Sequence, residues 1–347
     1  MNATIPTTMM AAVLHAAGDA DAFSLEHVAV PSVGDGEVLV KVAACGVSYR
    51  DVVERNGTYQ RDVSFPLIIG LEISGTVAQL GDRTSGLKLG EHVCSKAFSS
   101  CGACRLCRSG RETTCRERKP VRGGYAEYVV LPQDALVKVP DGIAFEQSCS
   151  LGPGAGVALN AIRDVAKLSV GENVLVTGAS GGVGIPSVQI AAATGARVIA
   201  LTRSADKADY LKSIGAADVV VSASAEDFSP AVRALTNEEG VEVVIDTVGS
   251  RVFDACFRSL AVHGRYAIVG QLFGEETSIN LARIFFKRAA LLGVGSVSRA
   301  QLSDAIALVE RGVLKPKVAD VMPLSAVHEA HRIVERGAVT GRIVLKL

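Results

Sequence analysis

The sequence predicts a two-domain α/β protein in which a β-rich domain is followed by a doubly wound parallel sheet. The chain has 347 residues, which is more than one ordinary hydrophobic core accommodates. Its first part contains short strand candidates separated by glycines, whereas strands and helical patterns alternate from Glu172 onward. The 48% hydrophobic content and the 35 glycines are typical of a compact α/β protein.

The first part of the chain contains short, apolar or alternating segments that end at glycines. These strand candidates are 37–45, 65–70, 73–81, 91–97 and 125–131. Alternation with glycine-rich turns indicates a β-rich, barrel-like unit between Ala11 and about Val139.

The second part alternates strands with helical patterns, and the change occurs at about residue 155. The predicted strands are 172–178, 196–202, 217–222, 241–249, 264–270 and 291–296. Helices are predicted from about Gly182 and from Ala205 to Ile214, and this alternation favours a parallel sheet with right-handed crossovers. Two further helical patterns and a last strand follow, at 299–312, 325–337 and 341–347.

Charge and hydropathy exclude some classes of partner. Lys+Arg and Asp+Glu balance at 36 each, so the sequence predicts neither a nucleic-acid partner nor a membrane-surface partner. The segment from Cys101 to Arg122 is locally basic, which we interpret as a solvated loop face, with attraction of an anionic substrate as the alternative. No apolar run has the length of a membrane span, and the first residues lack the basic start of a secretory signal. We therefore expect a cytoplasmic protein.

Four cysteines have the spacing C-x2-C-x2-C-x7-C. They are Cys101, Cys104, Cys107 and Cys115. Four thiolates in so short a segment can close a tetrahedral shell around Zn²⁺, which leaves no open position for substrate or water. The alternative is a disulfide-bonded or reduced loop, but the missing secretory signature argues against disulfides. The sequence therefore predicts one structural zinc ion per subunit.

This cysteine lobe resembles the structural-zinc lobe of the medium-chain dehydrogenase/reductases, the superfamily that includes the zinc alcohol dehydrogenases. The resemblance implies a GroES-like catalytic domain and a Rossmann cofactor domain. It implies that residues 1–154 and 299–347 form the catalytic domain, with the lobe at 94–122, because the tail returns to complete this domain. Residues 155–298 would then form the cofactor domain.

A glycine-rich loop provides the strongest functional signal. The strand that ends at Thr177 leads directly into GASGGVG and then into a helix rich in small residues. Glycines there let the backbone approach a pyrophosphate, which the N-terminus of the helix binds. The alternative is a tight turn without a ligand, but a strand before the loop and a helix after it argue against this alternative. The predicted phosphate-binding residues are Gly178, Ala179, Ser180, Gly181, Gly182, Val183 and Gly184.

The next strand predicts NADPH as the cofactor. Proteins that favour NAD carry Asp or Glu at the end of this strand, where the present chain has Arg203. A guanidinium group offers a forked, permanently charged partner for the 2′-phosphate. The alternative is that Arg203 and Lys207 are ordinary solvent-facing residues. The further predicted cofactor residues are Thr202, Arg203, Ser204, Lys207, Thr247, Val248, Gly270, Gly295 and Arg342.

The resemblance also indicates that the catalytic metal site is missing. Zinc alcohol dehydrogenases take ligands from a Cys in G-[IV]-C-x-[ST]-D, a His in G-H-E and a later Cys. The matching positions here are Ser48, Leu71 and either Pro153 or Gly154. These residues cannot form a zinc site with nitrogen and sulfur ligands, and Arg50 replaces the residue that relays the alcohol proton. We therefore expect no ordinary zinc-dependent alcohol oxidation.

Hydride addition to an activated C=C bond remains accessible without a metal, provided that a hydrogen-bond donor stabilises the enolate oxygen. The stretch that ends at Tyr59 resembles the D-x5-G-x-Y stretch of zinc-free quinone and enoyl reductases, in which the tyrosine lies beside the substrate. Tyr59 is the first predicted donor, and Tyr49, Arg50 and Ser48 are further candidates. The alternative for each tyrosine is a half-buried packing role. Glu72 is expected to pair with Arg50.

Most of the chain also resembles prokaryotic acryloyl-CoA reductases, in the stretches YRD, FPLIIG, LVTGASGGVGI and VIDTVG. This resemblance implies NADPH-dependent reduction of a short 2-enoyl-CoA, a small-molecule substrate. Two other functions stay open: an NADP-dependent alcohol or aldehyde oxidoreductase, and a non-catalytic NADPH-binding sensor. The apolar segment 289–296 reads as an edge strand, and related dehydrogenases pair this strand between subunits, so a homodimer or homotetramer is expected.

Overall fold

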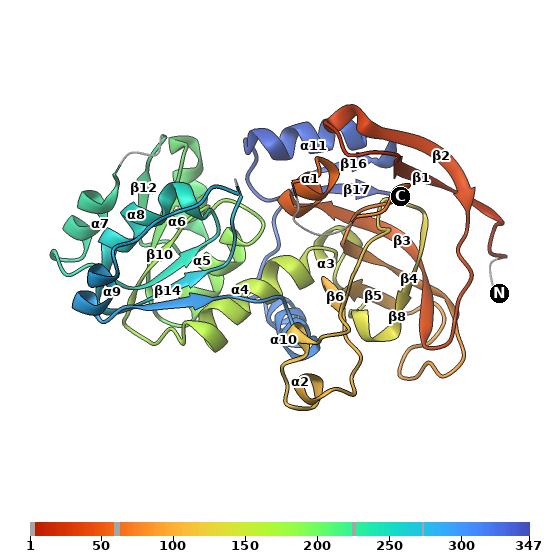
Figure 1. The fold of residues 1–347 in the computed structure, drawn as a ribbon, viewed down its shortest axis with the longest axis horizontal. Coiled ribbons are helices and arrows are strands. Elements are labelled where there is room, and N and C mark those ends of the chain that lie inside the picture. The colour runs from red at the N-terminus through yellow and green to blue at the C-terminus, as the bar shows by residue number, and fades with distance from the viewer. Residues whose placement is uncertain (1–3, 59–62, 224–226, 273) are drawn as a thin grey trace. The chain divides into compact units, whose positions relative to one another are not determined.

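The computed structural model describes residues 4–58, 63–223, 227–272 and 274–347 (Figure 1). The chain forms two compact units. Unit 1 comprises Met1–Pro153, Ser296–Glu310 and Pro316–Leu347, and unit 2 comprises Gly154–Gly295 and Arg311–Lys315. Both units combine helices with strands, which confirms the predicted α/β class.

Unit 1 is built around a sheet that has seven strands among the described residues. Its order is β16-β17-β3-β4-β5-β9, and β8 pairs with β3. All pairs are antiparallel except β16 with β17. The strands are β3 (Glu37–Val47), β4 (Glu72–Leu80), β5 (His92–Ser95), β8 (Tyr128–Pro132), β9 (Leu136–Lys138), β16 (Val318–Pro323) and β17 (Arg342–Lys346).

The last strand of the chain completes the core of unit 1. Ile343 and Leu345 of β17 are buried in the same apolar cluster as Val47 and Cys45 of β3, which lie opposite them in the antiparallel register. Figure 1 shows the blue ribbon of β17 beside the red-orange ribbon of β3. Removing the tail would therefore expose the apolar face of a central strand to water.

Two smaller strand pairs flank this sheet. They are the antiparallel hairpin of β1 (Thr8–Leu14) with β2 (Phe23–Ala29), and the pair of β6 (Phe98–Ser99) with β7 (Lys119–Pro120). The predicted strand at 65–70 is wrong, because this segment makes only an isolated bridge between Leu67 and Leu14. Pro66 has no N–H to donate to a ladder, and the apolar side chain of Ile69 serves the core instead.

The helices of unit 1 are α1 (Tyr49–Arg55), α2 (Arg105–Arg108), α3 (Phe145–Ser148), α10 (Arg299–Glu310) and α11 (Val327–Arg336). Sequence reasoning missed α1, which begins after Ser48 with a capping box formed with Asp51. It identified α11, which buries Val327, Ala330 and His331 and ends at Gly337, where a φ of 60° suits glycine.

Over its described residues, unit 2 contains a parallel sheet of six strands in the order β12-β11-β10-β13-β14-β15. This is the order of a doubly wound nucleotide-binding sheet, so the predicted topology is confirmed. The strands are β10 (Asn173–Val176), β11 (Arg197–Thr202), β12 (Asp218–Val221), β13 (Val241–Asp246), β14 (Leu260–Ile268) and β15 (Ala290–Gly293).

The helices of unit 2 are α4 (Val157–Leu159), α5 (Gly184–Ala193), α6 (Ala208–Ser213), α7 (Ser229–Leu235), α8 (Ser250–Ser259) and α9 (Leu281–Lys287). Sequence reasoning identified α5 and α6 and missed the other four. Among the helices that the structure describes, none combines the length and hydropathy that a membrane span requires.

Candidate active site

The four cysteines of the lobe meet as a metal site requires. The Sγ atoms lie within 4.8 Å of one another, and the Cys104–Cys107 and Cys101–Cys115 pairs are each 3.5 Å apart. Zinc–sulfur bonds of about 2.3 Å in a tetrahedron require sulfur atoms about 3.8 Å apart. The donor set and its geometry therefore fit Zn²⁺, which these four thiolates would hold with no ligand position left open.

Buried ion pairs attach this lobe to the rest of unit 1. The ammonium group of Lys96, which is 1% exposed, donates to Glu112 at 2.8 Å and to Asp134 at 3.2 Å. Asp134 also accepts from the backbone and the hydroxyl of Ser100, at 2.7 and 2.8 Å. The backbone N–H of Arg299 donates to Glu112 at 2.7 Å. Sequence reasoning missed these anchors, because their partners lie far apart along the chain.

The glycine-rich loop lies between β10 and α5, and its geometry excludes side chains at two positions. A Cβ atom on Gly184 would lie 2.1 Å from the carbonyl oxygen of Gly178, and one on Gly178 would lie 2.4 Å from Oγ1 of Thr247. Gly178 also has a φ of 55°, which L side chains rarely adopt. The tight turn aims the N-terminus of α5 at the end of the sheet, so the loop fits the pyrophosphate of a dinucleotide.

Asp246 connects this loop to the neighbouring strands. Its Oδ1 accepts from the hydroxyl of Thr177 at 2.7 Å and from the backbone N–H of Val248 at 2.9 Å. Its Oδ2 accepts from the hydroxyl of Tyr266 at 2.6 Å. Thr247 then donates through Oγ1 to the carbonyl of Thr177 at 2.9 Å. Sequence reasoning missed Asp246, although a carboxylate that ends an apolar strand is a visible signal.

Several predicted cofactor residues meet at this edge of the sheet. Thr247 and Val248 follow β13 beside the glycine loop. A Cβ atom on Gly270 would lie 2.9 Å from the carbonyl oxygen of Thr247. Gly295 follows β15, and its carbonyl accepts from Asn160 at 3.5 Å. The carboxyl ends of β10, β13, β14 and β15 therefore bring these residues to one side of unit 2.

Two basic residues, Arg203 and Lys207, follow the end of β11, and they differ in exposure. Arg203 is exposed, whereas Lys207 is only 8% exposed and is not a solvent-facing residue. Burial lowers the pKa of Lys207, the nearby Asp206 opposes this effect, and the Arg203 cation adds to it. The backbone N–H of Ala179 donates to the carbonyl of Leu201 at 3.2 Å, which joins this strand end to the glycine loop.

Replacing Arg203 with alanine should weaken NADPH binding by about 1.5–3 kcal/mol, the range for a hydrogen bond to a charged group. NADH binding should change little, because NADH lacks the 2′-phosphate. Fluorescence titration of both cofactors checks this expectation. The exposed Lys212 on α6 provides a matched control, since Lys212→Ala removes a charge farther from the strand end. Equal losses for both cofactors would mean that Arg203 supports the fold.

The residues at the positions that match the metal ligands of zinc alcohol dehydrogenases serve the fold here: Ser48, Leu71 and Pro153 lie in unit 1, and Gly154 is the first residue of unit 2. Ser48 caps α1, and its hydroxyl donates to Oδ2 of Asp51 at 2.6 Å. Leu71 is 3% exposed and packs in the apolar core. Pro153 and Gly154 lie in the helical turn Leu151–Gly156 and offer no side-chain donor. The donor set at these positions does not fit a zinc ion with nitrogen and sulfur ligands.

Two buried carboxyl groups lie beside these positions. Burial raises the pKa of Asp51 to about 6, although hydrogen bonds from Ser48 and the charge of Arg50 oppose the shift. Burial raises the pKa of Glu72 to about 7, against the charge of Arg342. The expected pair of Glu72 with Arg50 is wrong. The Nε atom of Arg342 lies 2.9 Å from Glu72, so this predicted cofactor residue is bound inside unit 1.

Glu72 should make the protein less stable as the pH rises from about 4.5 to about 7. These values are the ordinary pKa of glutamate and its pKa in the folded state. Between them the folded state retains a proton that the unfolded state has released, so the free energy of unfolding falls with rising pH. Because Glu72→Gln cannot titrate, its Tm should rise relative to that of the unmodified protein across this window.

Thermal unfolding measured from pH 4 to pH 8 tests this expectation. The exposed Glu239 supplies the control, Glu239→Gln, which removes a carboxyl group outside the site. A difference in Tm between Glu72→Gln and the unmodified protein that stays constant with pH would contradict the raised pKa.

The structure describes three of the four predicted catalytic residues, namely Ser48, Tyr49 and Arg50. Tyr59 lies outside the described residues. Tyr49 is the first residue of α1 and is half-buried. The guanidinium of Arg50 lies 5.2 Å from the centroid of the Phe98 ring. The hydroxyl of Ser48 donates its proton to Asp51, so it is already used inside the fold. Among the described candidates, this leaves Arg50 and Tyr49 to donate a hydrogen bond to a substrate.

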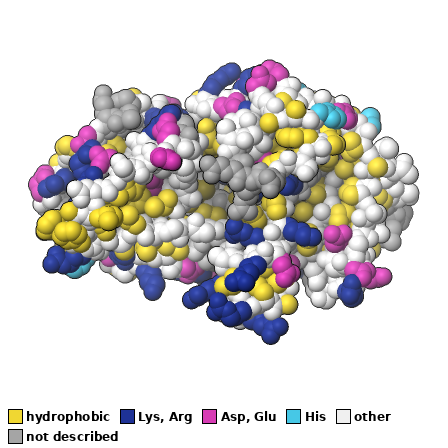
Figure 2. All heavy atoms as spheres, viewed as in Figure 1, with side chains coloured by type: hydrophobic (Ala, Val, Ile, Leu, Met, Phe, Trp, Pro, Cys, Tyr) yellow, Lys and Arg dark blue, Asp and Glu magenta, His cyan; other side chains and the backbone are white. Residues whose placement is uncertain are grey.

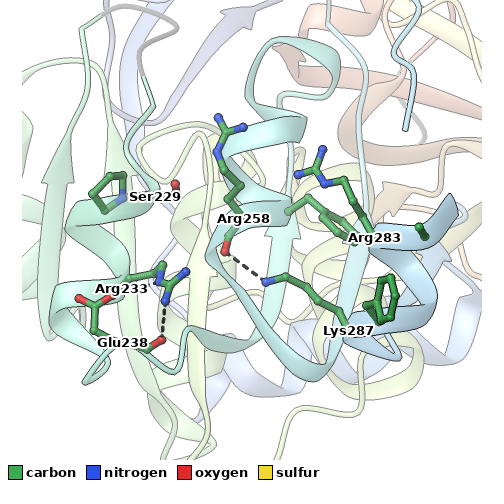
Figure 3. Close-up of a pocket in the computed structure, with 10 residues that line it drawn as sticks. Ser229, Arg233, Glu238, Arg258, Arg283 and Lys287 are labelled. Atoms are coloured by element: carbon green, nitrogen blue, oxygen red, sulfur yellow. Dashed lines mark hydrogen bonds and ion pairs between the residues drawn. The ribbon is translucent and has the colours of Figure 1, made fainter. Parts of the chain in front are cut away.

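A pocket of about 580 Å³ lies on unit 2 between α7, α8 and α9 (Figure 3). Its lining includes Arg233, Arg258, Arg283 and Lys287. Arg233 pairs with Glu238 at 3.1 Å, and Lys287 donates to the carbonyl of Arg258 at 3.2 Å. This contact lies at the C-terminus of α8, which leads directly into the start of β14. The pocket is therefore at the edge of the sheet where the strands begin. The glycine loop lies at the carboxyl edge, so the pocket is not part of the cofactor site.

A β-rich unit with a four-cysteine lobe, combined with a doubly wound sheet and a glycine-rich loop, defines a class of dehydrogenases. Residues 34–141 match the alcohol dehydrogenase GroES-like domain, and residues 182–311 match the zinc-binding dehydrogenase family. The chain belongs to the medium-chain dehydrogenase/reductase superfamily and is an oxidoreductase of that family. This finding confirms the resemblance seen in the sequence.

Individual relatives cover nearly the whole chain. The acryloyl-coenzyme A reductase of Sulfurisphaera tokodaii is 32% identical over 334 residues, which cover 95% of this chain and 98% of that protein. The NAD-dependent alcohol dehydrogenase of Sulfolobus acidocaldarius is 32% identical over 350 residues, covering 98% and 100%. The crystal structure of AibC has a TM-score of 0.91 at 38% identity and covers 98% of this chain and 96% of AibC.

Proposed function

We propose that this protein is an NADPH-dependent reductase that reduces the activated C=C bond of a small enoyl substrate without a catalytic zinc. The substrate would be a short enoyl thioester of the acryloyl-CoA type, an enone or a quinone. The similarity to an acryloyl-coenzyme A reductase over almost the full length of both chains supports this substrate class.

One observation carries the metal-free part of the proposal: the residues at the former ligand positions serve the fold. Ser48 caps a helix and Leu71 fills the core, so neither can turn toward a metal ion without loss of these contacts. In the part of the chain that the structure describes, Cys101, Cys104, Cys107 and Cys115 make up the group with enough donors for a metal. That group has a closed, structural geometry.

The chemistry follows from the groups that remain. Reduced nicotinamide, held by the glycine loop from Gly178 to Gly184, would supply hydride for the β-carbon of the enoyl group. The protein must then stabilise the enolate oxygen with a hydrogen-bond donor and deliver a proton to the α-carbon. Tyr59 is our first candidate for the donor, and Arg50 and Tyr49 are the described alternatives. The buried carboxyl of Glu72, with a pKa of about 7, retains a proton close to neutral pH.

NADPH is the proposed cofactor because the exposed Arg203 and the buried Lys207 follow β11, the strand whose end reads the adenosine ribose in sheets of this kind. A second candidate function is an NADP-dependent alcohol or aldehyde dehydrogenase. The 32% identity to an NAD-dependent alcohol dehydrogenase favours it.

Steady-state turnover with a panel of substrates distinguishes these functions. The panel contains acryloyl-CoA, crotonyl-CoA, an enone and a quinone with NADPH or NADH, and short alcohols with the oxidised cofactors. Consumption of NADPH with an enoyl substrate and no oxidation of alcohols is the expected result. Alcohol oxidation would favour the second candidate, and tight NADPH binding with no turnover would indicate a sensor.

We further propose that two chains pair through β15, the edge strand of the unit 2 sheet. Its residues from Ala290 to Leu292 are apolar and only half-buried, and exposed apolar edges tend to be paired. The adjacent helix α9 exposes Phe285 and Phe286, by 61% and 71%, and Figure 2 shows apolar side chains gathered over this helix.

Light scattering at micromolar concentration should therefore give at least twice the chain mass of 36.1 kDa. Leu292→Arg should shift the protein toward the monomer, because it adds a charge to the proposed strand pair. Val170→Arg is the control, since Val170 is an apolar residue of unit 2 that is 79% exposed and distant from β15 in the sheet order. A monomer in the unmodified protein would count against the proposal.

A further inference from the structure

Two arginines lie against one aromatic ring in unit 1, and a third shares a carboxylate with one of them. The guanidinium carbons of Arg50 and Arg118 lie 5.2 and 5.0 Å from the centroid of the Phe98 ring. Arg122 pairs with Glu54 at 2.5 Å, and Arg50 approaches the same carboxylate at 3.8 Å. We call these five residues the arginine cluster. Its members come from α1, β6 and the segment around β7.

Local structure explains why these residues meet. Arg50 and Glu54 are four residues apart on α1, so they lie on the same face of that helix. Strand β6 pairs with β7 in a register that places Phe98 opposite Pro120, two residues from both Arg118 and Arg122. The antiparallel pair thus returns the far end of the zinc lobe to the helix that carries Arg50.

The cluster carries excess positive charge. The guanidinium groups of Arg122 and Arg50 face the carboxylate of Glu54, and Arg50 also acts on the carboxyl of Asp51. Within the cluster, three arginines outnumber the single acid, Glu54. Arg118 donates to a neutral partner, the carbonyl of Thr113, at 2.7 Å. Figure 2 shows further Lys and Arg side chains over the lobe around α2, which add to the positive field.

The cluster is partly open to solvent and close to the proposed reaction site. The side chains of Arg50 and Arg122 are 18% and 24% exposed, whereas Glu54 is 1% exposed and lies beneath them. Arg50 is two residues from Ser48, on the same short helix. A guanidinium group can stack on an aromatic ring and also make planar, bidentate contacts with a phosphate or carboxylate.

We propose that the arginine cluster binds an oxyanion group of the substrate, supplied either by the phosphates of a coenzyme A carrier or by a carboxylate on the acyl chain. This inference rests on the proposed enoyl reductase function and deepens it, because it adds a charge requirement to the substrate.

Arg118→Gln is the decisive variant, because it removes one charge and leaves the buried pair of Glu54 with Arg122. Arg118→Lys keeps the charge and loses the planar fork. Arg105→Gln is the matched control: Arg105 is exposed on α2 of the same lobe and lies outside the cluster. Zinc content and Tm, measured for all variants, establish that the lobe remains folded.

Calorimetric titration with saturated product analogues requires no turnover. The ligands are butyryl-CoA, S-butyryl-N-acetylcysteamine and S-glutaryl-N-acetylcysteamine, of which the first carries phosphates, the second no anionic group and the third a carboxylate. If the carrier phosphates bind, Arg118→Gln should weaken butyryl-CoA binding about tenfold and leave the two short thioesters unchanged. If the acyl carboxylate binds, the glutaryl thioester should show a similar loss relative to its butyryl analogue.

Arg105→Gln should match the unmodified protein in both cases, and Arg118→Lys should lose less affinity than Arg118→Gln. Unchanged binding of every ligand, an equal loss for all three, or the same loss in Arg105→Gln would overturn the proposal. Turnover of acryloyl-CoA is measured separately. A protein that reduces no enoyl substrate but loses butyryl-CoA affinity in Arg118→Gln would refute the proposed reaction and retain the anion site.

Discussion

Replacing Tyr59 with phenylalanine should lower the turnover number for an enoyl substrate by about 10²–10³-fold, the usual cost of removing one donor to a developing oxyanion. The change deletes a single hydroxyl and keeps the ring, so packing is largely preserved. NADPH affinity should hardly change, because the proposed cofactor contacts are the glycine loop of unit 2 and Arg203. Stopped-flow measurement of NADPH oxidation, together with a cofactor titration, gives both quantities.

Tyr49→Phe tests the second tyrosine among the candidate donors. Tyr49 is half-buried at the start of α1. Tyr49→Phe also removes one phenolic hydroxyl, from a residue close in sequence to Tyr59. If Tyr59→Phe turns over normally and Tyr49→Phe does not, the donor is Tyr49. If both are normal, the donor must be sought at Arg50 or Ser48.

The second large effect is expected at the zinc lobe. Cys104→Ala should reduce the zinc content from one ion to none per chain and should unfold the lobe, because metal binding and local folding are coupled. Structural zinc ions in isolated finger peptides contribute about 10–16 kcal/mol of apparent binding free energy at neutral pH. Part of that energy would be lost here, so the free energy of unfolding should fall markedly.

Elemental analysis and thermal unfolding measure these changes. Cys94→Ala is the control, because Cys94 is a buried thiol of β5 outside the cysteine cluster and its loss should leave the zinc in place. Two zinc ions per unmodified chain would contradict the metal-free reaction, and none would contradict the structural site. A chelator too weak to remove the lobe zinc should leave the reduction rate unchanged.

Features that depend on short stretches of chain could be predicted from the sequence. The four sulfur atoms lie within 15 residues, so their spacing alone limits them to one ion. The glycine loop is equally local, because a strand, a turn and a helix N-terminus are contiguous. The alternation of strands and helices was sufficient to predict the doubly wound sheet, whose strand order the structure confirms.

Short elements were harder to predict, since their stability comes from tertiary packing and little of it from their own sequence. Helix α1 has seven residues and was missed, although its capping box is visible in the sequence. The segment at 65–70 has the apolar composition of a strand, but its side chains serve the core while its backbone pairs at one point. Composition alone does not separate these two outcomes.

Charge pairing was decided by the tertiary structure. Glu72 was expected to pair with Arg50, yet its partner is Arg342, which the antiparallel register of β17 with β3 and of β3 with β4 brings to it from the other end of the chain. Arg118 and Arg50 face one ring because β6 pairs with β7. Residue types at a local spacing determine which chemistry is available, whereas partners far apart in sequence are set by strand register, which only the folded sheet defines.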